Sequence, residues 1–396
     1  MTAVSFKNVD IIFGDSPDDA VKMLDQGATR QEILDATGKV LGAAGASIDI
    51  EEGEICVFMG LSGSGKSTLL RAVNGLNSVT RGEVLVDYDG RKIDVASCDK
   101  NTLRELRTSK VAMVFQQFAL LPWRTVRENV GLGLELKGMS RKARNAIVDE
   151  KLKLVGLDEW ADKYAHELSG GMQQRVGLAR AFATDADILL MDEPFSALDP
   201  LIRDKLQDEL LDLQHALKKT IIFVSHDLDE AMKIGTHIAI MESGRIVQYG
   251  EPEDIVLNPA NDYVAEFVAH MNPINVLRAA SLMRPLSRME RDGDEYVLDW
   301  SGQNRLTLDA EEGIASIRVC GEPAEMLTYS QGMDLPRFKD KHPGSILAAS
   351  PRILMREAIN IRYHTGLPVP LVEDGKLVGV VGGDEIYHGL LRLQDT

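Results

Sequence analysis

The fold is decided by the stretch Gly60-Leu61-Ser62-Gly63-Ser64-Gly65-Lys66-Ser67-Thr68, which matches the pattern of a phosphate-binding loop. Glycines in such a loop let backbone N–H groups turn towards phosphate oxygens, and the following helix adds its positive N-terminus. The apolar run Ile55–Met59 predicts a strand before the loop, and Lys66–Val73 predicts a helix after it. The stretch therefore predicts a nucleotide-binding α/β fold, with Lys66 at the β- and γ-phosphates and Ser67 on Mg²⁺.

A second apolar run, Ile188–Met191, ends in the acidic pair Asp192 and Glu193. An uninterrupted apolar run of this length is typical of a buried parallel strand. Beside a phosphate loop, Asp192 is placed to hold Mg²⁺ through water, and Glu193 to accept a proton from the attacking water. Acidic pairs at strand ends are also common surface features, so these roles depend on the loop at residues 60–68.

Composition limits the partners of the chain. A length of 396 residues allows two or three domains, and a formal net charge of -17 argues against nucleic acid or acidic lipid as the main partner. No apolar run approaches the ~20 residues of a membrane-spanning helix, and we expect no secretory signal after Met1. The cysteines Cys56, Cys98 and Cys320 lie far apart, which favours reduced thiols over a disulfide framework or a zinc site.

The N-terminal part begins with a predicted strand, Ser5–Phe13, and continues with a helical insertion over residues 15–38. Ser16 is expected to cap the first helix of this insertion, while Thr29 and Glu32 form a capping-box pattern for the second. Two short helices between two strands are the prediction for this segment.

The remaining chain is predicted to form a helical subdomain over residues 118–185, further β-α-β structure, and then a separate domain. Asn272-Pro273 marks the boundary, giving a nucleotide-binding domain over 1–270 and a C-terminal domain over 271–396. In the latter we expect a hairpin over 296–308, a helix over 355–363, and strands at 369–372 and 377–381.

The stretch Leu168-Ser169-Gly170-Gly171-Met172-Gln173-Gln174-Arg175 closely resembles the LSGGQ-type signature of ATP-binding cassette (ABC) ATPases. Ser169 is suited to cap the next helix, and the two glycines expose N–H groups for a second phosphate site. The resemblance implies that this site, formed by Ser169, Gly170 and Gly171, serves the ATP held by the other subunit of a head-to-tail homodimer. Met172 stands where many members have glutamine, a variant familiar in importers.

The same resemblance implies roles for residues outside the signature. Gln116 matches the loop glutamine that senses Mg²⁺ and the attacking water, and His226 matches the switch histidine at the γ-phosphate. Ser196–Asp199 matches the loop that communicates across the dimer, so Asp199 is counted among the nucleotide-binding residues. Alone, Gln116 or His226 would more often be structural, but their order and spacing favour catalytic roles beside Glu193.

The aromatic residue that stacks on adenine departs from the family pattern. Members usually supply it from the first strand, where Phe13 is the candidate. Asp10 stands where a tyrosine is expected, and a core position explains Phe13 equally well.

The resemblance implies an α/β fold: a P-loop ABC ATPase with a RecA-like core, an antiparallel β subdomain and a helical signature subdomain. The insertion and the C-terminal domain resemble those of the osmolyte importers, whose ATPases end in a pair of cystathionine-β-synthase-type (CBS) modules. Ser350–Leu390 resembles one such α+β module, whereas Asn275–Leu335 matches poorly, so a first module would be degenerate. Sensing of ionic strength or nucleotide and simple bracing of a dimer are both open for this domain.

The implied activity is import of choline, glycine betaine or proline betaine, with ATP and Mg²⁺ as cofactors. The implied partners are a separate permease and, indirectly, a substrate-binding protein, which would hold the chain at the cytoplasmic face of the inner membrane. Trp123, Trp160 and Trp300 lie apart and form no cage for a quaternary amine, which fits substrate binding elsewhere. Trp123 suits a permease contact or a core position.

The alternatives are an ATPase for another solute and a soluble ABC ATPase outside transport. Acidic charge, a single signature and the lack of heptads oppose the second alternative.

Overall fold

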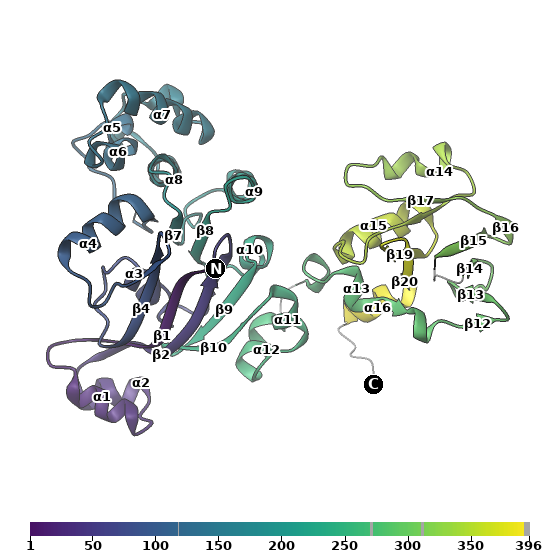
Figure 1. The fold of residues 1–396 in the computed structure, drawn as a ribbon, viewed down its shortest axis with the longest axis horizontal. Coiled ribbons are helices and arrows are strands. Elements are labelled where there is room, and N and C mark those ends of the chain that lie inside the picture. The colour runs from purple at the N-terminus through teal and green to yellow at the C-terminus, as the bar shows by residue number, and fades with distance from the viewer. Residues whose placement is uncertain (118, 270–271, 310–312, 392–396) are drawn as a thin grey trace. The chain divides into compact units, whose positions relative to one another are not determined.

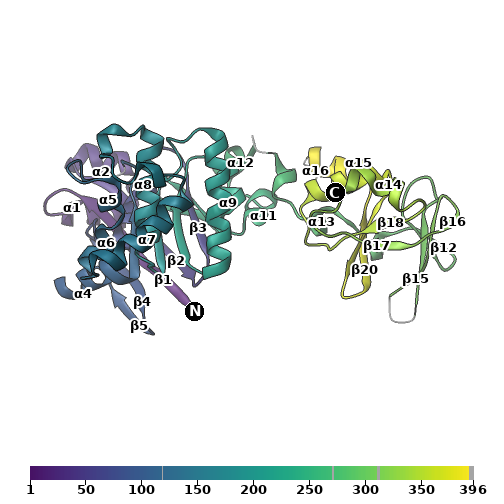
Figure 2. The ribbon, with the colours of Figure 1, turned by 90° about the horizontal axis from the view of Figure 1, so that it is seen from above.

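The computed structural model describes residues 1–117, 119–269, 272–309 and 313–391, and the chain divides into two compact units, Met1–Val268 and Ala269–Thr396. Figures 1 and 2 give two views of the ribbon. Position 118, where the predicted helical subdomain starts, and positions 270–271, at the predicted domain boundary, lie outside the described residues. Among the described residues, no helix combines the length and the apolar character needed to cross a membrane.

The first unit is built on a six-stranded sheet with the order β10-β9-β3-β8-β7-β6. Its strands are β3 (Ile55–Met59), β6 (Val111–Val114), β7 (Ile188–Asp192), β8 (Thr220–Val224), β9 (His237–Glu242) and β10 (Arg245–Gly250). All pairings are parallel except that of β10 with β9. Every residue of β3, β7 and β8 is buried, which explains their nearly uninterrupted apolar sequences.

Helices connect these strands, so that the loops after β3, β6, β7 and β8 meet at one edge of the sheet. The helices of the first unit between β3 and the C-terminal end of the unit are α3 (Lys66–Ala72), α4 (Lys100–Glu105), α5 (Val126–Val130), α6 (Leu132–Leu136), α7 (Arg141–Leu154), α8 (Gly170–Ala183), α9 (Pro200–Leu217), α10 (Leu228–Ile234), α11 (Pro252–Leu257) and α12 (Asp262–Ala269). Figure 1 places α5, α6 and α7 together beyond α8, in a helical subdomain.

A four-stranded antiparallel sheet with the order β2-β1-β4-β5 packs against the larger sheet. It consists of β1 (Thr2–Phe13), β2 (Val40–Glu51), β4 (Arg81–Tyr88) and β5 (Arg91–Asp94). The edge-to-face rings of Phe6 and Phe58, 6.1 Å apart, lie in the core between the two sheets. The sequence pattern predicts β1 and the end of β2 but not β4 or β5.

The predicted insertion is present as α1 (Asp18–Asp25) and α2 (Arg30–Thr37) between β1 and β2. The capping box of Thr29 and Glu32 is confirmed. The predicted Ser16 cap is wrong, because Pro17 occupies the N-cap position and no side chain caps α1. Pro17 already has helical backbone angles, and Asp18 and Asp19 place negative charge in the first turn, where the helix dipole favours it.

The second unit contains a three-stranded sheet, a five-stranded antiparallel meander and a parallel strand pair. The strands are β11 (Arg284–Pro285), β12 (Arg291–Asp292), β13 (Glu295–Val297), β14 (Arg305–Leu308), β15 (Ile314–Val319), β16 (Glu322–Pro323), β17 (Met326–Thr328), β18 (Ile346–Ala348), β19 (Val369–Glu373) and β20 (Lys376–Val381), and the helices are α13 (Ala279–Leu282), α14 (Phe338–Lys341), α15 (Met355–Thr365) and α16 (Gly383–Leu391). The predicted hairpin is confirmed by the pairing of β13 with β14, as are the predicted helix and the two later strands.

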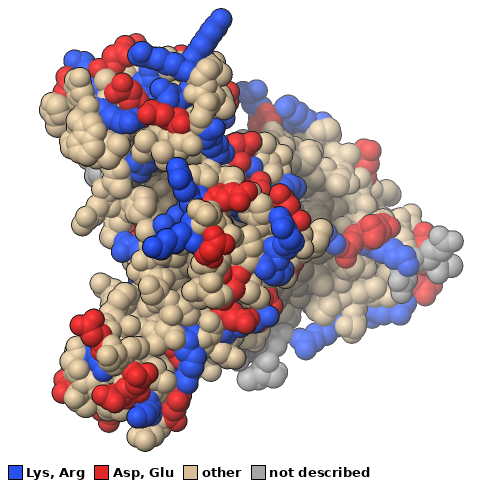
Figure 3. All heavy atoms as spheres, turned by 60° about the vertical axis from the view of Figure 1, so that its left-hand side comes forward, with Lys and Arg blue, Asp and Glu red and all other residues tan. Residues whose placement is uncertain are grey.

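Figure 3 draws the charged side chains on one face of the molecule. On the face drawn in Figure 3, the Lys and Arg residues that the structure describes are interspersed with Asp and Glu residues and form no continuous basic field.

Candidate active site

The phosphate loop lies between β3 and α3, and its backbone requires glycine at two positions. At Gly60, with φ +145°, an added Cβ would lie 2.2 Å from the carbonyl oxygen of Met241. At Gly65, with φ +104°, it would lie 2.3 Å from the carbonyl oxygen of Gly42. Any side chain at either position would therefore displace backbone, so the loop conformation depends on these glycines.

Lys66 and Ser64 supply the polar groups of this loop. Lys66 is 6% exposed, and its Nζ donates to the carbonyl oxygens of Gly60 at 2.8 Å and Leu61 at 3.0 Å. Burial lowers the pKa of Lys66, against the opposing effect of nearby carboxylates. The hydroxyl of Ser64 is buried and has no hydrogen-bond partner among the described residues. A buried hydroxyl and a cation inside a tight glycine turn fit a phosphate chain.

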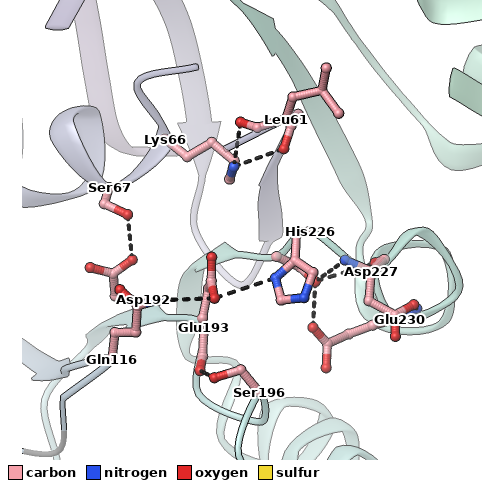
Figure 4. A network of polar contacts seen from close by, with 12 residues as sticks. Leu61, Lys66, Ser67, Gln116, Asp192, Glu193, Ser196, His226, Asp227 and Glu230 are labelled. Carbon is pink, nitrogen blue, oxygen red and sulfur yellow. Dashed lines mark hydrogen bonds and ion pairs between the residues drawn. The ribbon is translucent and has the colours of Figure 1, made fainter. Parts of the chain in front are cut away.

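Asp192, at the end of β7, faces the first turns of α3 (Figure 4). Ser67 Oγ donates to its Oδ1 at 2.6 Å, and Arg71 Nη2 pairs with its Oδ2 at 2.7 Å. The Asp192 side chain is fully buried. The oxygens of Ser67 and Asp192 are of the type that Mg²⁺ prefers. Among the described residues no cluster of three or more His, Cys, Asp or Glu could hold a metal, so an ion here would also need water and phosphate oxygens.

The backbone of Glu193 is held in an uncommon conformation. Its φ of +48° lies in the left-handed region, which non-glycine residues rarely adopt. Its N–H donates to Val224 O at 3.1 Å, and its carbonyl oxygen accepts from Ser196 Oγ at 3.0 Å and Gln174 Nε2 at 3.2 Å. Bonds from β8, α8 and the loop after β7 therefore hold the backbone of Glu193 in place.

The Glu193 carboxylate lies between the other two predicted catalytic residues. Gln116 Nε2, just after β6, donates to its Oε2 at 3.1 Å. His226 Nδ1, just after β8, lies 3.3 Å from the same oxygen. Both side chains are exposed, so they can reach a bound ligand as well as Glu193. The structure thus brings together Gln116, Glu193 and His226 from three neighbouring strands, as Figure 4 shows.

The start of the signature lies at the N-terminus of α8, and Asp199 lies at the N-terminus of α9. Ser169 caps α8, and its Oγ accepts from Met172 N at 3.4 Å. Asp199 caps α9 by accepting from Ile202 N at 3.1 Å. Ser169, Gly170 and Asp199 are exposed, and no hydrogen bond or ion pair among the described residues joins them to residues 60–68. Within one chain, the signature therefore presents its helix N-terminus to solvent.

Phe13 and Asp10 face different surroundings on β1. Phe13 is 42% exposed. A Cβ added at Gly42 would lie 2.7 Å from the ring edge of Phe13 and 2.8 Å from the methyl group of Thr68, so both side chains flank Gly42. The Phe13 ring therefore lies beside the first turn of α3, on the surface. Asp10 is 2% exposed and pairs with Arg81 at 2.6 Å, so it cannot stack on a base.

Several contacts of the site were not predicted from the sequence. Arg71 could have been found, because it follows Ser67 by four residues and so shares its helix face. Gln174, buried on α8 against the Glu193 carbonyl, carries no local signal. The same holds for Arg30 of α2, which donates to the carbonyl of Gly63 in the phosphate loop.

A sequence family described as ABC transporter matches residues 43–196. The chain is 52% identical to the glycine betaine/proline betaine transport system ATP-binding protein ProV of Escherichia coli, over 98% of each chain. It is 41% identical to the glycine betaine transport ATP-binding protein OpuAA of Bacillus subtilis, over 97% of this chain and 93% of that protein. The chain belongs to the ATP-binding proteins of ABC transporters.

Solved structures agree with this assignment. The ABC ATPase resembles the ATP-binding cassette MJ0796, solved as a dimer in a post-hydrolysis state with ADP and Pi. Identity is 32% and the TM-score is 0.54, over 63% of this chain and 98% of that chain. The predicted P-loop ABC ATPase fold is confirmed for the first unit. As a member of this family, the chain binds ATP and couples its hydrolysis to transport.

Proposed function

We propose that this ABC ATPase drives the import of quaternary amine osmolytes, such as glycine betaine, proline betaine and choline, through a separate permease. The observation that carries the proposal is the nearly full-length similarity to ProV, which includes both the insertion and the second unit. A glycine betaine/carnitine/choline transport ATP-binding protein of Bacillus subtilis is 43% identical over 84% of this chain. An importer for another solute would be expected to match such relatives less completely.

For hydrolysis, each polar residue of the site receives one role. Lys66, Ser64 and the loop N–H groups bind the phosphates. Ser67 and Asp192 would hold Mg²⁺, which would neutralise charge on the phosphate oxygens. Glu193 accepts the proton of the attacking water, and its fixed backbone supports that role because a general base must be precisely placed.

Gln116 and His226 complete the catalytic group. Their contacts with the same Glu193 oxygen support roles at the attacking water and the terminal phosphate. Phe13 stacks on adenine, which its position beside α3 supports.

The proposed working form is a homodimer. Ser169, Gly170, Gly171 and Asp199 complete the nucleotide site of a second copy. The exposure of Ser169, Gly170 and Asp199, and the lack of bonds from them to their own phosphate loop among the described residues, support this. The dimeric state of the MJ0796 cassette agrees with this arrangement.

The permease would hold the dimer at the cytoplasmic face of the inner membrane, with a substrate-binding protein acting on the permease. Trp123 is 71% exposed, so the core position considered for it is wrong, and it remains a candidate contact for the permease. A soluble ABC ATPase that acts on nucleic acid is disfavoured by the net charge of -17 and by the mixed surface charges.

The second unit is proposed to be a regulatory domain over 271–396 with one CBS-like module, and the nucleotide-binding domain would then span 1–270. The order β18-α15-β19-β20-α16 supports one module, close to the range Ser350–Leu390. The five-stranded meander β12–β16 occupies the region where a first module would lie, which supports a degenerate first module.

Uptake of labelled glycine betaine, proline betaine and choline in cells with and without this chain tests the proposal. We expect uptake of at least one to be lost without the chain and restored by the wild type but not by Glu193→Gln. Labelled proline is the control, because it lacks a quaternary nitrogen. Unchanged uptake of all three compounds would overturn the substrate assignment and leave the ATPase assignment intact.

A further inference from the structure

The loop that carries His226 is anchored by a buried acid, Glu230 of α10. Glu230 is 8% exposed, and its Oε2 accepts from Ser225 Oγ at 2.5 Å. Its Oε1 accepts from Nε2 of Gln207, which is 4% exposed on α9, at 3.0 Å. Figure 4 shows Glu230 directed at the loop on the side away from Glu193. The carboxylate therefore bridges α9 and the residue before His226.

Ser225 fixes the backbone on both sides of His226. Its own N–H donates to Phe58 O at 3.2 Å, and its Oγ accepts from Asp227 N at 2.9 Å. Ser225 is 1% exposed, so water cannot replace these bonds easily. The position of the imidazole near Glu193 thus depends on where Glu230 holds Ser225.

Helix α9, which supplies Gln207 to this contact, directly follows the loop Ser196–Asp199. Asp199 caps α9, the helix that carries Gln207. One turn along, Arg203 donates to Leu198 O at 3.4 Å and to Asp227 Oδ2 at 3.2 Å. Helix α9 therefore contacts both the loop that ends at Asp199 and the loop that carries His226.

We propose that Glu230 and Gln207 are positioning residues that hold His226 at a fixed position relative to the loop Ser196–Asp199. The proposal rests on the roles proposed for Glu193 and His226. Burying a carboxylate costs free energy unless hydrogen bonds compensate. Burial raises the pKa of Glu230, and the hydrogen bonds from Ser225 and Gln207 oppose this shift. Such a group gives directed contacts that an apolar residue of the same volume would not.

Exchanging the two side chains tests the bridge. Gln207→Glu replaces the donating amide by a second buried carboxyl group, so at an alkaline pH where both carboxylates are ionised they repel each other and the contact opens. In the double variant Gln207→Glu with Glu230→Gln, the amide of residue 230 can donate to residue 207 and accept from Ser225, and the bridge re-forms. Gln214→Glu is the matched control, since Gln214 is buried on the same helix and bonds to Gly53 instead.

The measurements are kcat and KM for ATP of the full-length chain, with the thermal midpoint of unfolding. We expect kcat of Gln207→Glu to fall roughly tenfold with KM within about twofold, because a misplaced catalytic group slows chemistry without weakening binding. The double variant should recover most of kcat. The Gln214→Glu variant should lose stability but keep kcat.

Wild-type kcat in Gln207→Glu, no recovery in the double variant, or an equal loss in Gln214→Glu would each overturn the proposal. If Gln207→Glu does not fold, Gln207→Leu removes the bond without adding charge, and kcat must still fall severalfold at unchanged KM. Failure of the catalytic roles themselves would be recognised separately, as brisk turnover in Glu193→Gln.

Discussion

At the end of β7 in the first unit, Asp192 is fully buried between Ser67 and Arg71, whereas in the second unit the ion pair of Arg352 and Glu373 has side chains 78% and 43% exposed. A buried charge is tolerated only with specific partners, so its position is fixed. An exposed pair can exchange its partners for water at little cost. The buried polar contacts of the first unit therefore point to its function, whereas the exposed ion pair of the second unit does not.

The largest effect is expected at Glu193, where the fixed carboxylate should be indispensable. Glu193→Gln keeps the size of the side chain and its contact with Gln116 but cannot accept a proton. We expect kcat for ATP hydrolysis to fall by about 10²–10⁴-fold, the usual contribution of a general base, while ATP binding is retained. Steady-state hydrolysis and nucleotide-binding titrations measure the two quantities.

The control for this variant is Asp229→Asn, which removes an exposed acid from the neighbouring helix α10. Its kcat should stay within about twofold of the wild type, because exposed charges away from the reacting atoms contribute little. Rapid turnover in Glu193→Gln would contradict the general-base role and would weaken the contrast between the two units.

The next effect is expected in the phosphate loop. Gly60→Ala adds a Cβ that would lie 2.2 Å from Met241 O, so the backbone must shift. Strain of about 2 kcal/mol corresponds to roughly thirtyfold weaker ATP binding, measured by titration. Gly63→Ala is the control, because Gly63 also has a positive φ but has nothing within 4 Å of the added atom. Equal losses of ATP affinity in both variants would show that the positive φ, and not the contact with Met241 O, is the reason why the loop needs glycine.

The sequence was sufficient for those parts of the site that lie in one continuous stretch. Residues 60–68, the pair Asp192 and Glu193, and the Ser169 cap were all predicted, because each motif combines its residue types at fixed spacing. Contacts between distant segments were not predictable, such as Gln174 with the carbonyl of Glu193, because a glutamine in a helix carries no sign of its partner.

The strands that were missed have a similar explanation. β4 (Arg81–Tyr88) and β5 (Arg91–Asp94) carry many charged residues and only a few buried ones, such as Val84 and Val86. The first half of β2 is rich in glycine and alanine, which are poor signals for a strand. β2 and β4 are strands because they pair with β1, and β5 because it pairs with β4, and such pairing is a tertiary property.

A smaller effect is expected at Arg81, which pairs with one buried and one exposed acid. Its Nε lies 2.6 Å from Asp10, and its Nη2 lies 2.8 Å from Asp25 of the insertion. Arg81→Ala leaves the buried Asp10 carboxylate without its cation, which should cost about 1.5 kcal/mol of the free energy of unfolding. Denaturant unfolding measures this cost. Asp25→Asn, which removes only the exposed ion pair of Arg81, should lower the free energy of unfolding clearly less. Equal losses would show that the buried carboxylate of Asp10 does not cause the effect of Arg81→Ala.

The smallest effect is expected in the second unit, at the exposed pair of Arg352 and Glu373, 3.1 Å apart. Arg352→Ala should change the free energy of unfolding by no more than ~0.5 kcal/mol, because water and salt screen the pair and its side-chain entropy is regained. The same denaturant series measures it, with Glu373→Gln as the partner variant. A loss near that of Arg81→Ala would mean that this pair is desolvated in the working protein, as it would be if another chain covered it. The contrast between the two units would then hold only for the isolated subunit.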